Sequence, residues 1–244
     1  MTGIYRIAEL NIEIRSLYPA VHDYCRDYAS DGPIDLVIEI FPSDIEFERE
    51  KALQEAQAEC LIPRIFPDDY LEELAVYRKL ADQIPFFGSY LFHGSAVSVD
   101  GKAYLFTAPS GTGKSTHARL WREILQEHAV MVNDDKPLIR VTESGSPLIY
   151  GTPYDGKHRL SSNLCVPLKA ICLLERAEDN TICRCTAKEI YPVLLEQLYR
   201  PSDRSATVKV LELFDQTLSN VKLFRLSCNM DPEAAQIAYE AMRR

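Results

Sequence analysis

The spacing of apolar residues in the first third of the chain predicts a small module of strands and helices. Between residues 4 and 15, Leu10, Ile12 and Ile14 are separated by single polar residues, which predicts one half-buried strand. The same spacing analysis predicts a second strand at 36–41 and helices at 18–29, from Asp44 onward and at 69–82. Residues 1–85 are therefore predicted to form a small N-terminal α+β module.

Strands and helices follow one another in a different order from residue 86 onward. Two predicted strands, at 90–99 and 102–107, flank an Asp100-Gly101 pair that is typical of a hairpin turn. The pattern then predicts a helix at 114–127, strands at 129–133, 137–142, 147–150, 169–175, 181–185 and 221–227, and helices at 187–198, 205–219 and from Pro232 onward. Residues 86–244 are therefore predicted to form a larger α/β domain.

The segment 108–115, Ala-Pro-Ser-Gly-Thr-Gly-Lys-Ser, has the spacing of a phosphate-binding loop between a strand and a helix, with Ala108 in place of the first glycine. The glycines allow backbone N–H groups to converge on phosphate oxygens, Lys114 would bridge the outer phosphates, and the Ser115 hydroxyl would bind Mg²⁺. ATP and Mg²⁺ are the predicted cofactors, and the predicted nucleotide-binding residues are Ser110, Gly111, Thr112, Gly113, Lys114, Ser115 and Thr116. The alternative is a glycine-rich turn with a chance Gly-Lys-Ser.

Two adjacent carboxylates, Asp134 and Asp135, follow the strand predicted at 129–133. The helix after the loop and the short return strand should bring them back beside Ser115. One carboxylate could hold Mg²⁺ or its water, and the other could accept a proton from a hydroxyl that attacks phosphate. An exposed turn before Lys136 is the alternative.

Two further groups are candidates for the same site. His93 lies on the predicted strand 90–99, and the hairpin should bring it near the phosphates, although a core histidine is the simpler interpretation. The polar segment 151–159 offers Asp155 as an outer metal ligand, and Lys157 and Arg159 as phosphate or substrate donors. An ordinary surface loop is the alternative for this segment.

Composition narrows the classes of partner. The formal net charge is −9, which argues against a general nucleic-acid or anionic-membrane surface. Seven cysteines with irregular spacing, no signal-peptide pattern and no long apolar run predict a cytoplasmic protein without disulfides.

Three segments together resemble the HPr kinase/phosphorylase and phosphoenolpyruvate carboxykinase superfamily: His93-Gly94, the run 110–116 and Asp134-Asp135. The resemblance covers roughly residues 86–175, and it implies a P-loop kinase core with a mixed sheet. It further implies that Lys114 and Ser115 hold phosphate and metal, that Asp135 accepts the proton with His93 assisting, and that Asp134 lies on the metal side.

The residues and the resemblance together predict an ATP- and Mg²⁺-dependent kinase that phosphorylates a Ser or Thr hydroxyl of a peptide or small protein. The N-terminal module would recognise the acceptor or a partner, and a homo-oligomer is compatible with the sequence. Two alternatives remain open: a small-molecule kinase acting on free serine or a sugar, and a nucleotide-binding regulator without turnover.

Overall fold

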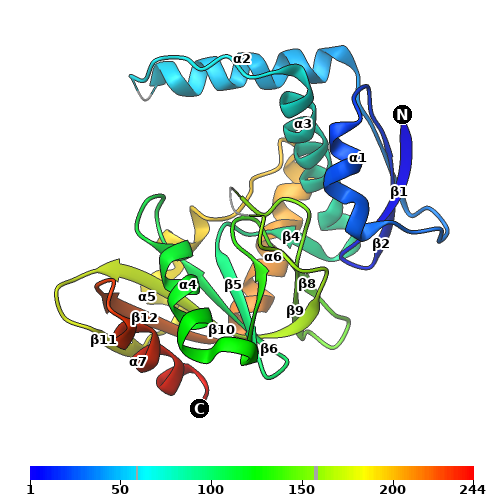
Figure 1. Cartoon of the computed structure of the whole chain (residues 1–244). Coiled ribbons are helices and arrows are strands. Elements are labelled where there is room, and N and C mark those ends of the chain that lie inside the picture. The colour runs from blue at the N-terminus through cyan, green and yellow to red at the C-terminus, as the bar shows by residue number, and fades with distance from the viewer. Residues whose placement is uncertain (59, 157–158) are drawn as a thin grey trace. The chain divides into compact units, whose positions relative to one another are not determined.

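The computed structural model describes residues 1–58, 60–156 and 159–244 (Figure 1). The chain divides into two compact units, Met1–Gln83 and Ile84–Arg244. The sequence analysis set the boundary two residues later, after residue 85. In the described residues, no helix is long and apolar enough to cross a bilayer. All seven cysteines are free thiols.

The first unit contains a three-stranded sheet of order β1-β2-β3, in which β1 and β2 are antiparallel and β2 and β3 are parallel. Its elements are β1 (Thr2–Ile7), β2 (Leu10–Arg15), α1 (Ala20–Cys25), η1 (Arg26–Tyr28), β3 (Leu36–Glu39), α2 (Pro42–Ala58) and α3 (Asp68–Gln83). The single strand predicted at 4–15 is wrong, because the chain reverses at Ala8 and Glu9 with φ of 48° and 69°. Neither residue type favours positive φ, so the sequence carries no turn signal there.

Among its described residues, the second unit contains a curled mixed sheet of nine strands with helices on both faces, which confirms the predicted α/β class (Figure 1). The strand order is β4-β8-β9-β10-β6-β5-β7, with β12 beside β10 and β11 beside β12. The strands β6, β10 and β12 run parallel to one another. Its elements are η2 (Ile84–Phe87), β4 (Ser89–Leu91), β5 (Ser95–Val99), β6 (Lys102–Thr107), α4 (Lys114–Leu125), η3 (Gln126–His128), β7 (Ala129–Asn133), β8 (Leu138–Val141), β9 (Pro147–Tyr150), β10 (Cys165–Arg176), β11 (Thr181–Arg184), α5 (Ala187–Leu195), α6 (Arg204–Asn220), β12 (Lys222–Cys228) and α7 (Pro232–Met242).

Central strands of this sheet are buried on both faces, because each face is covered by helices. On β6, Tyr104 and Phe106 join a core with Trp121 of α4 and Ala238 of α7. The intervening Leu105 joins the opposite core, which is built from α5 and α6. Successive side chains of a strand point to opposite faces, so the continuous apolar run of β6 serves both cores.

The strand predicted at 90–99 is divided in two, which changes the place of His93. β4 pairs with β8, whereas β5 pairs with β6 and β7. His93 therefore lies in the connection between two strands and not within one. Gly94 is required beside it, since a Cβ there would lie 2.8 Å from the carbonyl oxygen of Phe106.

Candidate phosphate-binding and acid–base site

The phosphate loop connects the end of β6 to the first residue of α4. Gly111 and Gly113 have φ of +76° and +123°, which residues with a Cβ rarely adopt. Ser110, Gly111 and Ser115 are exposed to solvent. The loop therefore presents its backbone and the N-terminus of a twelve-residue helix to solvent, an arrangement that favours anions.

Lys114 is the buried cation of this loop, with only 8% of its surface exposed. Its Nζ donates a hydrogen bond to the carbonyl oxygen of Ala108 at 2.9 Å. Burial lowers the pKa of this ammonium group, and the nearby carboxylates of Asp135 and Asp134 oppose that effect. An ammonium group has three donors, so the bond to Ala108 leaves capacity for phosphate oxygens.

Arg176, the last residue of β10, holds the outer side of the loop, and the sequence analysis missed it. Its Nε donates to the carbonyl oxygen of Thr112 at 3.2 Å, and its Nη2 donates to the carbonyl oxygen of Gly111. Because these carbonyl oxygens are engaged by Arg176, the peptide units that carry them are fixed in orientation. No sequence motif marks this residue, which lies 65 positions beyond Gly111.

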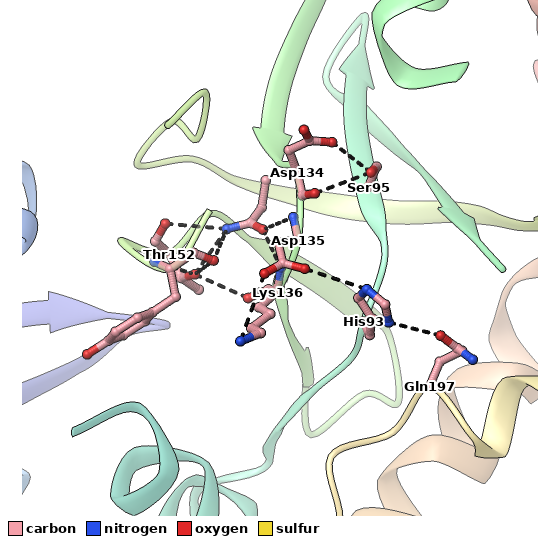
Figure 2. Close-up of polar contacts among 9 residues, drawn as sticks. His93, Ser95, Asp134, Asp135, Lys136, Thr152 and Gln197 are labelled. Atoms are coloured by element: carbon pink, nitrogen blue, oxygen red, sulfur yellow. Dashed lines mark hydrogen bonds and ion pairs between the residues drawn. The ribbon is translucent and has the colours of Figure 1, made fainter. Parts of the chain in front are cut away.

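Asp134 faces the phosphate loop. Its Oδ1 accepts a hydrogen bond from Ser95 Oγ of β5 at 2.7 Å (Figure 2). Asp134 also lines a cavity of about 200 Å³ together with Ser115 and Thr116 from the start of α4. A carboxylate and a hydroxyl thus border one space beside the loop.

Asp135 points to a different neighbour, His93 (Figure 2). The distance from His93 Nε2 to Asp135 Oδ1 is 3.5 Å, and about a third of each side chain is exposed. On the other side of the ring, His93 Nδ1 lies 3.0 Å from Oε1 of Gln197. An amide oxygen only accepts, so Nδ1 carries a proton and Nε2 is the nitrogen that faces the carboxylate.

The backbone around His93 is fixed by three segments. The His93 N–H donates to the carbonyl oxygen of Gln197 at 2.8 Å, and the Gly94 N–H donates to that of Asp135 at 3.0 Å. The His93 carbonyl oxygen accepts a bond from Thr107 Oγ1 at 3.1 Å. Gln197 thus contacts His93 through both its backbone and its side chain, and sequence analysis did not identify it.

Burial lowers the pKa of His93, and the positive charge of Lys114 lowers it further. The carboxylate of Asp135 and the hydrogen bond that His93 donates to Gln197 act in the opposite direction and raise the pKa. The electrostatic environment of His93 therefore includes both the phosphate loop and the aspartate pair. Lys114 of the phosphate loop therefore interacts electrostatically with both His93 and Asp135, which come from two other segments.

Asn133, the last residue of β7, shapes the bend that contains the two aspartates, and the sequence analysis did not identify it either. It is fully buried, and its Oδ1 accepts bonds from the N–H groups of Asp135 at 2.9 Å and Lys136 at 2.7 Å. Its Nδ2 donates to Thr152 Oγ1 at 3.0 Å. Asn133 therefore joins the end of β7 to the loop after β9. An asparagine at the end of a predicted strand, where its side chain can accept from the N–H two residues ahead, is the sequence signal that could have revealed it.

Asp155 lies in the loop after β9, where it accepts a hydrogen bond from the backbone. Only 6% of it is exposed, and its Oδ2 accepts a hydrogen bond from the Ser161 N–H at 2.9 Å. Within the ranges that the structure describes, no group of three or more His, Cys, Asp or Glu side chains could hold a metal ion. Lys157, the suggested phosphate donor, lies outside the described residues.

The residues nevertheless fit Mg²⁺ bound together with a nucleotide. Mg²⁺ in phosphotransfer sites takes one or two protein oxygens, and the phosphates and water supply the rest. Ser115 and Asp134 border one cavity and offer oxygen ligands of this kind. Of the three predicted metal ligands, Ser115 and Asp134 are the two that the fold places at one cavity.

Comparison with known proteins shows a structural similarity without a sequence match. No family model matches the sequence, and no curated protein matches it. Among solved structures, the chain is similar to the Hpr(Ser) kinase/phosphatase from Coxiella burnetii. The identity is 9%, the match covers 62% of this chain and 95% of that chain, and the TM-score is 0.34. Similarity at this level is too weak to carry an argument about the site, whose interpretation rests on its own residues.

Proposed function

We propose that this chain is an ATP- and Mg²⁺-dependent kinase that transfers the γ-phosphoryl group to a hydroxyl. One observation carries the proposal: two adjacent aspartates, both close enough to Lys114 to favour its charged form, face different partners. Asp134 borders a cavity with Ser115, whereas Asp135 faces His93. This division suits phosphoryl transfer, in which one carboxylate can serve the metal and another can serve the acceptor.

The nucleotide side consists of the loop amides of residues 110–116, Lys114 and the N-terminus of α4. These groups would hold the phosphates and neutralise charge that develops on the transferred group. Ser115 and Asp134 would hold Mg²⁺, which supplies further neutralisation of the phosphate charge when bound. Ser95 keeps the Asp134 carboxylate in place through its 2.7 Å hydrogen bond.

The acceptor side consists of Asp135, His93 and Gln197. As the acceptor oxygen forms its bond to the γ-phosphorus, the bond from that phosphorus to the bridging oxygen of ADP breaks. Asp135 would take the proton that leaves the hydroxyl. His93 Nε2, 3.5 Å from Asp135 Oδ1, would share that proton. Gln197 keeps this nitrogen facing the carboxylate.

The proposed acceptor is a Ser or Thr hydroxyl of a peptide or small protein. The partial exposure of His93 and Asp135, 34% and 31%, supports an acceptor that approaches from solvent. We further propose that the unit Met1–Gln83 recognises this acceptor or a partner.

The test is transfer of label from γ-³²P-ATP with Mg²⁺ by the full chain. The acceptors are cell-extract proteins, serine- and threonine-containing peptides, free serine and sugars. We expect label on a protein or peptide hydroxyl with the wild type and none with Lys114→Ala. Label on free serine or a sugar alone would make the chain a small-molecule kinase. ATP binding without transfer to any acceptor would make it a regulator.

A further inference from the structure

The negative charge of the chain is concentrated in its first unit. Residues 1–83 contain 18 Asp and Glu residues and 8 Lys and Arg residues, which gives a formal charge of −10. Residues 84–244 contain 18 Asp and Glu residues and 19 Lys and Arg residues, which gives a formal charge of +1. A partner of Met1–Gln83 with positive charge would therefore be attracted to this unit and to no comparable degree by the rest of the chain.

The cations of this unit leave much of its acidic surface uncompensated, because most of them already pair within the unit. Among the described residues, six of its Lys and Arg side chains form ion pairs with acids of the same unit. Arg78, for example, pairs with the buried Glu48, and Lys79 pairs with Asp44 at 2.6 Å. Because the acids outnumber the cations, carboxylates remain that a partner can neutralise.

The segment 60–67, which connects α2 to α3, is held against α2 at both ends (Figure 1). At its start, the Leu61 N–H donates to the carbonyl oxygen of Ala56 at 2.8 Å. Directly after its end, Asp68 pairs with Arg49 at 2.6 Å. These two anchors give the segment a defined position along α2, so the side chains between them form part of one surface with the helix.

The apolar side chains of this segment point to solvent. Leu61, Ile62 and Ile65 are 59%, 89% and 97% exposed. On α2, Leu53 is 40% exposed and lies four residues after the anchor Arg49, so it is on the side of the helix along which the segment runs. Single exposed apolar residues are ordinary, but a group of them on one surface marks a site of interaction.

Acidic side chains border these apolar ones. Glu46 and Glu50 are exposed and precede Leu53 by seven and three residues, so the three side chains lie on one face of α2. Glu46 pairs with Arg49 at 3.1 Å, whereas Glu50 forms no ion pair with any residue that the structure describes. The two acids and four apolar residues together form an acidic–apolar surface, composed of Glu46, Glu50, Leu53, Leu61, Ile62 and Ile65.

We propose that the acidic–apolar surface binds a cationic segment of the phosphoryl acceptor, in which Lys or Arg residues alternate with apolar side chains. The apolar side chains would cover Ile62 and Ile65, and the cations would lie beside Glu46 and Glu50. The inference rests on the proposed function in naming the acceptor as the partner. A second copy of the chain brings another unit of charge −10, and an anionic membrane is also repelled, so charge favours the cationic segment over both.

The test measures binding of three synthetic peptides to the full chain in the absence of nucleotide. One peptide has alternating Lys and Leu around a single serine, the second has Glu in place of Lys, and the third has Ala in place of Leu. Fluorescence anisotropy would give each affinity, and transfer from γ-³²P-ATP to the serine would give KM and kcat. We expect the Lys–Leu peptide to bind at least about tenfold more tightly than the other two, because both kinds of contact contribute.

The matching variants change exposed residues, so each should fold normally. Ile62→Ser combined with Ile65→Ser should weaken binding of the Lys–Leu peptide about tenfold or more and raise its KM without lowering kcat. Glu50→Lys should weaken binding about threefold, with a smaller effect at high salt. Asp31→Lys and Ile34→Ser make the same kinds of change at exposed residues outside the surface, and as controls they should leave affinity and KM unchanged.

Each other result overturns the inference in a recognisable way. Failure of the Lys–Leu peptide to bind, or equal affinity for the Lys and Glu peptides, would exclude a cationic partner. Equal loss of affinity in Asp31→Lys and Glu50→Lys would mean that the charge of the whole unit attracts the peptide, without a site at this surface. Concentration-dependent dimerisation in sedimentation velocity that the double Ile→Ser variant abolishes would make the surface an interface between two copies.

The two proposals fail in different ways. Peptide binding that depends on the surface, without transfer to any acceptor, would refute the kinase and leave a binding surface for cationic segments. Transfer to an acceptor whose KM is the same for the wild type and the double Ile→Ser variant would keep the kinase and overturn the inference.

Discussion

The phosphate loop and the acid–base cluster are built in opposite ways. The loop groups of residues 108–116 are consecutive in the chain and lie between one strand and one helix. The cluster of His93, Asp135 and Gln197 comes from three segments, and its histidine and glutamine are 104 positions apart. Short-range spacing therefore determines the loop, whereas only the packing of the whole sheet assembles the cluster.

The two regions meet electrostatically at Lys114. Burial alone would favour the neutral amine, but Asp135 and Asp134 favour the charged form. The same ammonium group helps to lower the pKa of His93. A change in one region should therefore alter the charge balance of the other, although damage to each region should produce a different defect. Damage to the loop should affect nucleotide binding, and damage to the cluster should affect transfer.

The largest effect that separates the regions is expected from Asp135→Asn. The amide of asparagine cannot take up the proton that leaves the substrate hydroxyl, so the transfer rate should fall roughly 10²–10⁴-fold. Affinity for Mg²⁺–ATP should remain within a few-fold, because the loop is intact. Label transfer and titration calorimetry on the same preparation would measure both quantities.

Asp134→Asn is the matched control for that experiment, because it removes the neighbouring carboxylate, which borders the cavity with Ser115 and does not face His93. It should raise the Mg²⁺ concentration needed for activity, since Asp134 borders the cavity with Ser115. A loss of Mg²⁺–ATP binding in Asp135→Asn would contradict the division of roles and would make Asp135 a metal ligand.

The difference between the two regions also explains what the sequence could predict. The loop was located because its spacing between a strand and a helix is specific, and the bounds 102–107 and 129–133 coincide with β6 and β7. His93 was expected on a strand, yet its backbone bonds go to Gln197 and Thr107 instead. Gln197 and Arg176 act through contacts to residues 104 and 65 positions away, which leave no periodicity or motif in the sequence. Asn133 differs, because it bonds the N–H groups of Asp135 and Lys136 directly after it.

A smaller effect should distinguish the two faces of the His93 ring. Gln197→Leu removes the acceptor of the Nδ1 proton, so the ring is less well oriented and kcat should fall about tenfold. The hydrogen bond that His93 Nδ1–H donates to Gln197 raises the pKa of His93, so its loss should lower that pKa further. If transfer requires the neutral ring, the acidic limb of the pH–rate profile should move to lower pH.

Gln197→Glu is the conservative variant that reverses this shift. A carboxylate beside Nδ1 favours the charged ring, so the acidic limb should move to higher pH than in the wild type. Thermal melting would check that both variants fold, because Gln197 is buried. If the pH profiles of both variants coincide with that of the wild type, Gln197 has only a packing role.

The smallest effect is expected on the loop side, from Arg176→Gln. The arginine engages the carbonyl oxygens of Thr112 and Gly111, but it is exposed, so the loop should remain formed. Loss of exposed hydrogen bonds of this kind should raise KM for ATP about threefold and leave kcat unchanged. Arg243→Gln, at an exposed arginine that pairs with Glu240, controls for the lost charge and should change neither constant. A fall in kcat with unchanged KM would instead connect Arg176 to the transfer step, and the separation between loop and cluster would no longer hold.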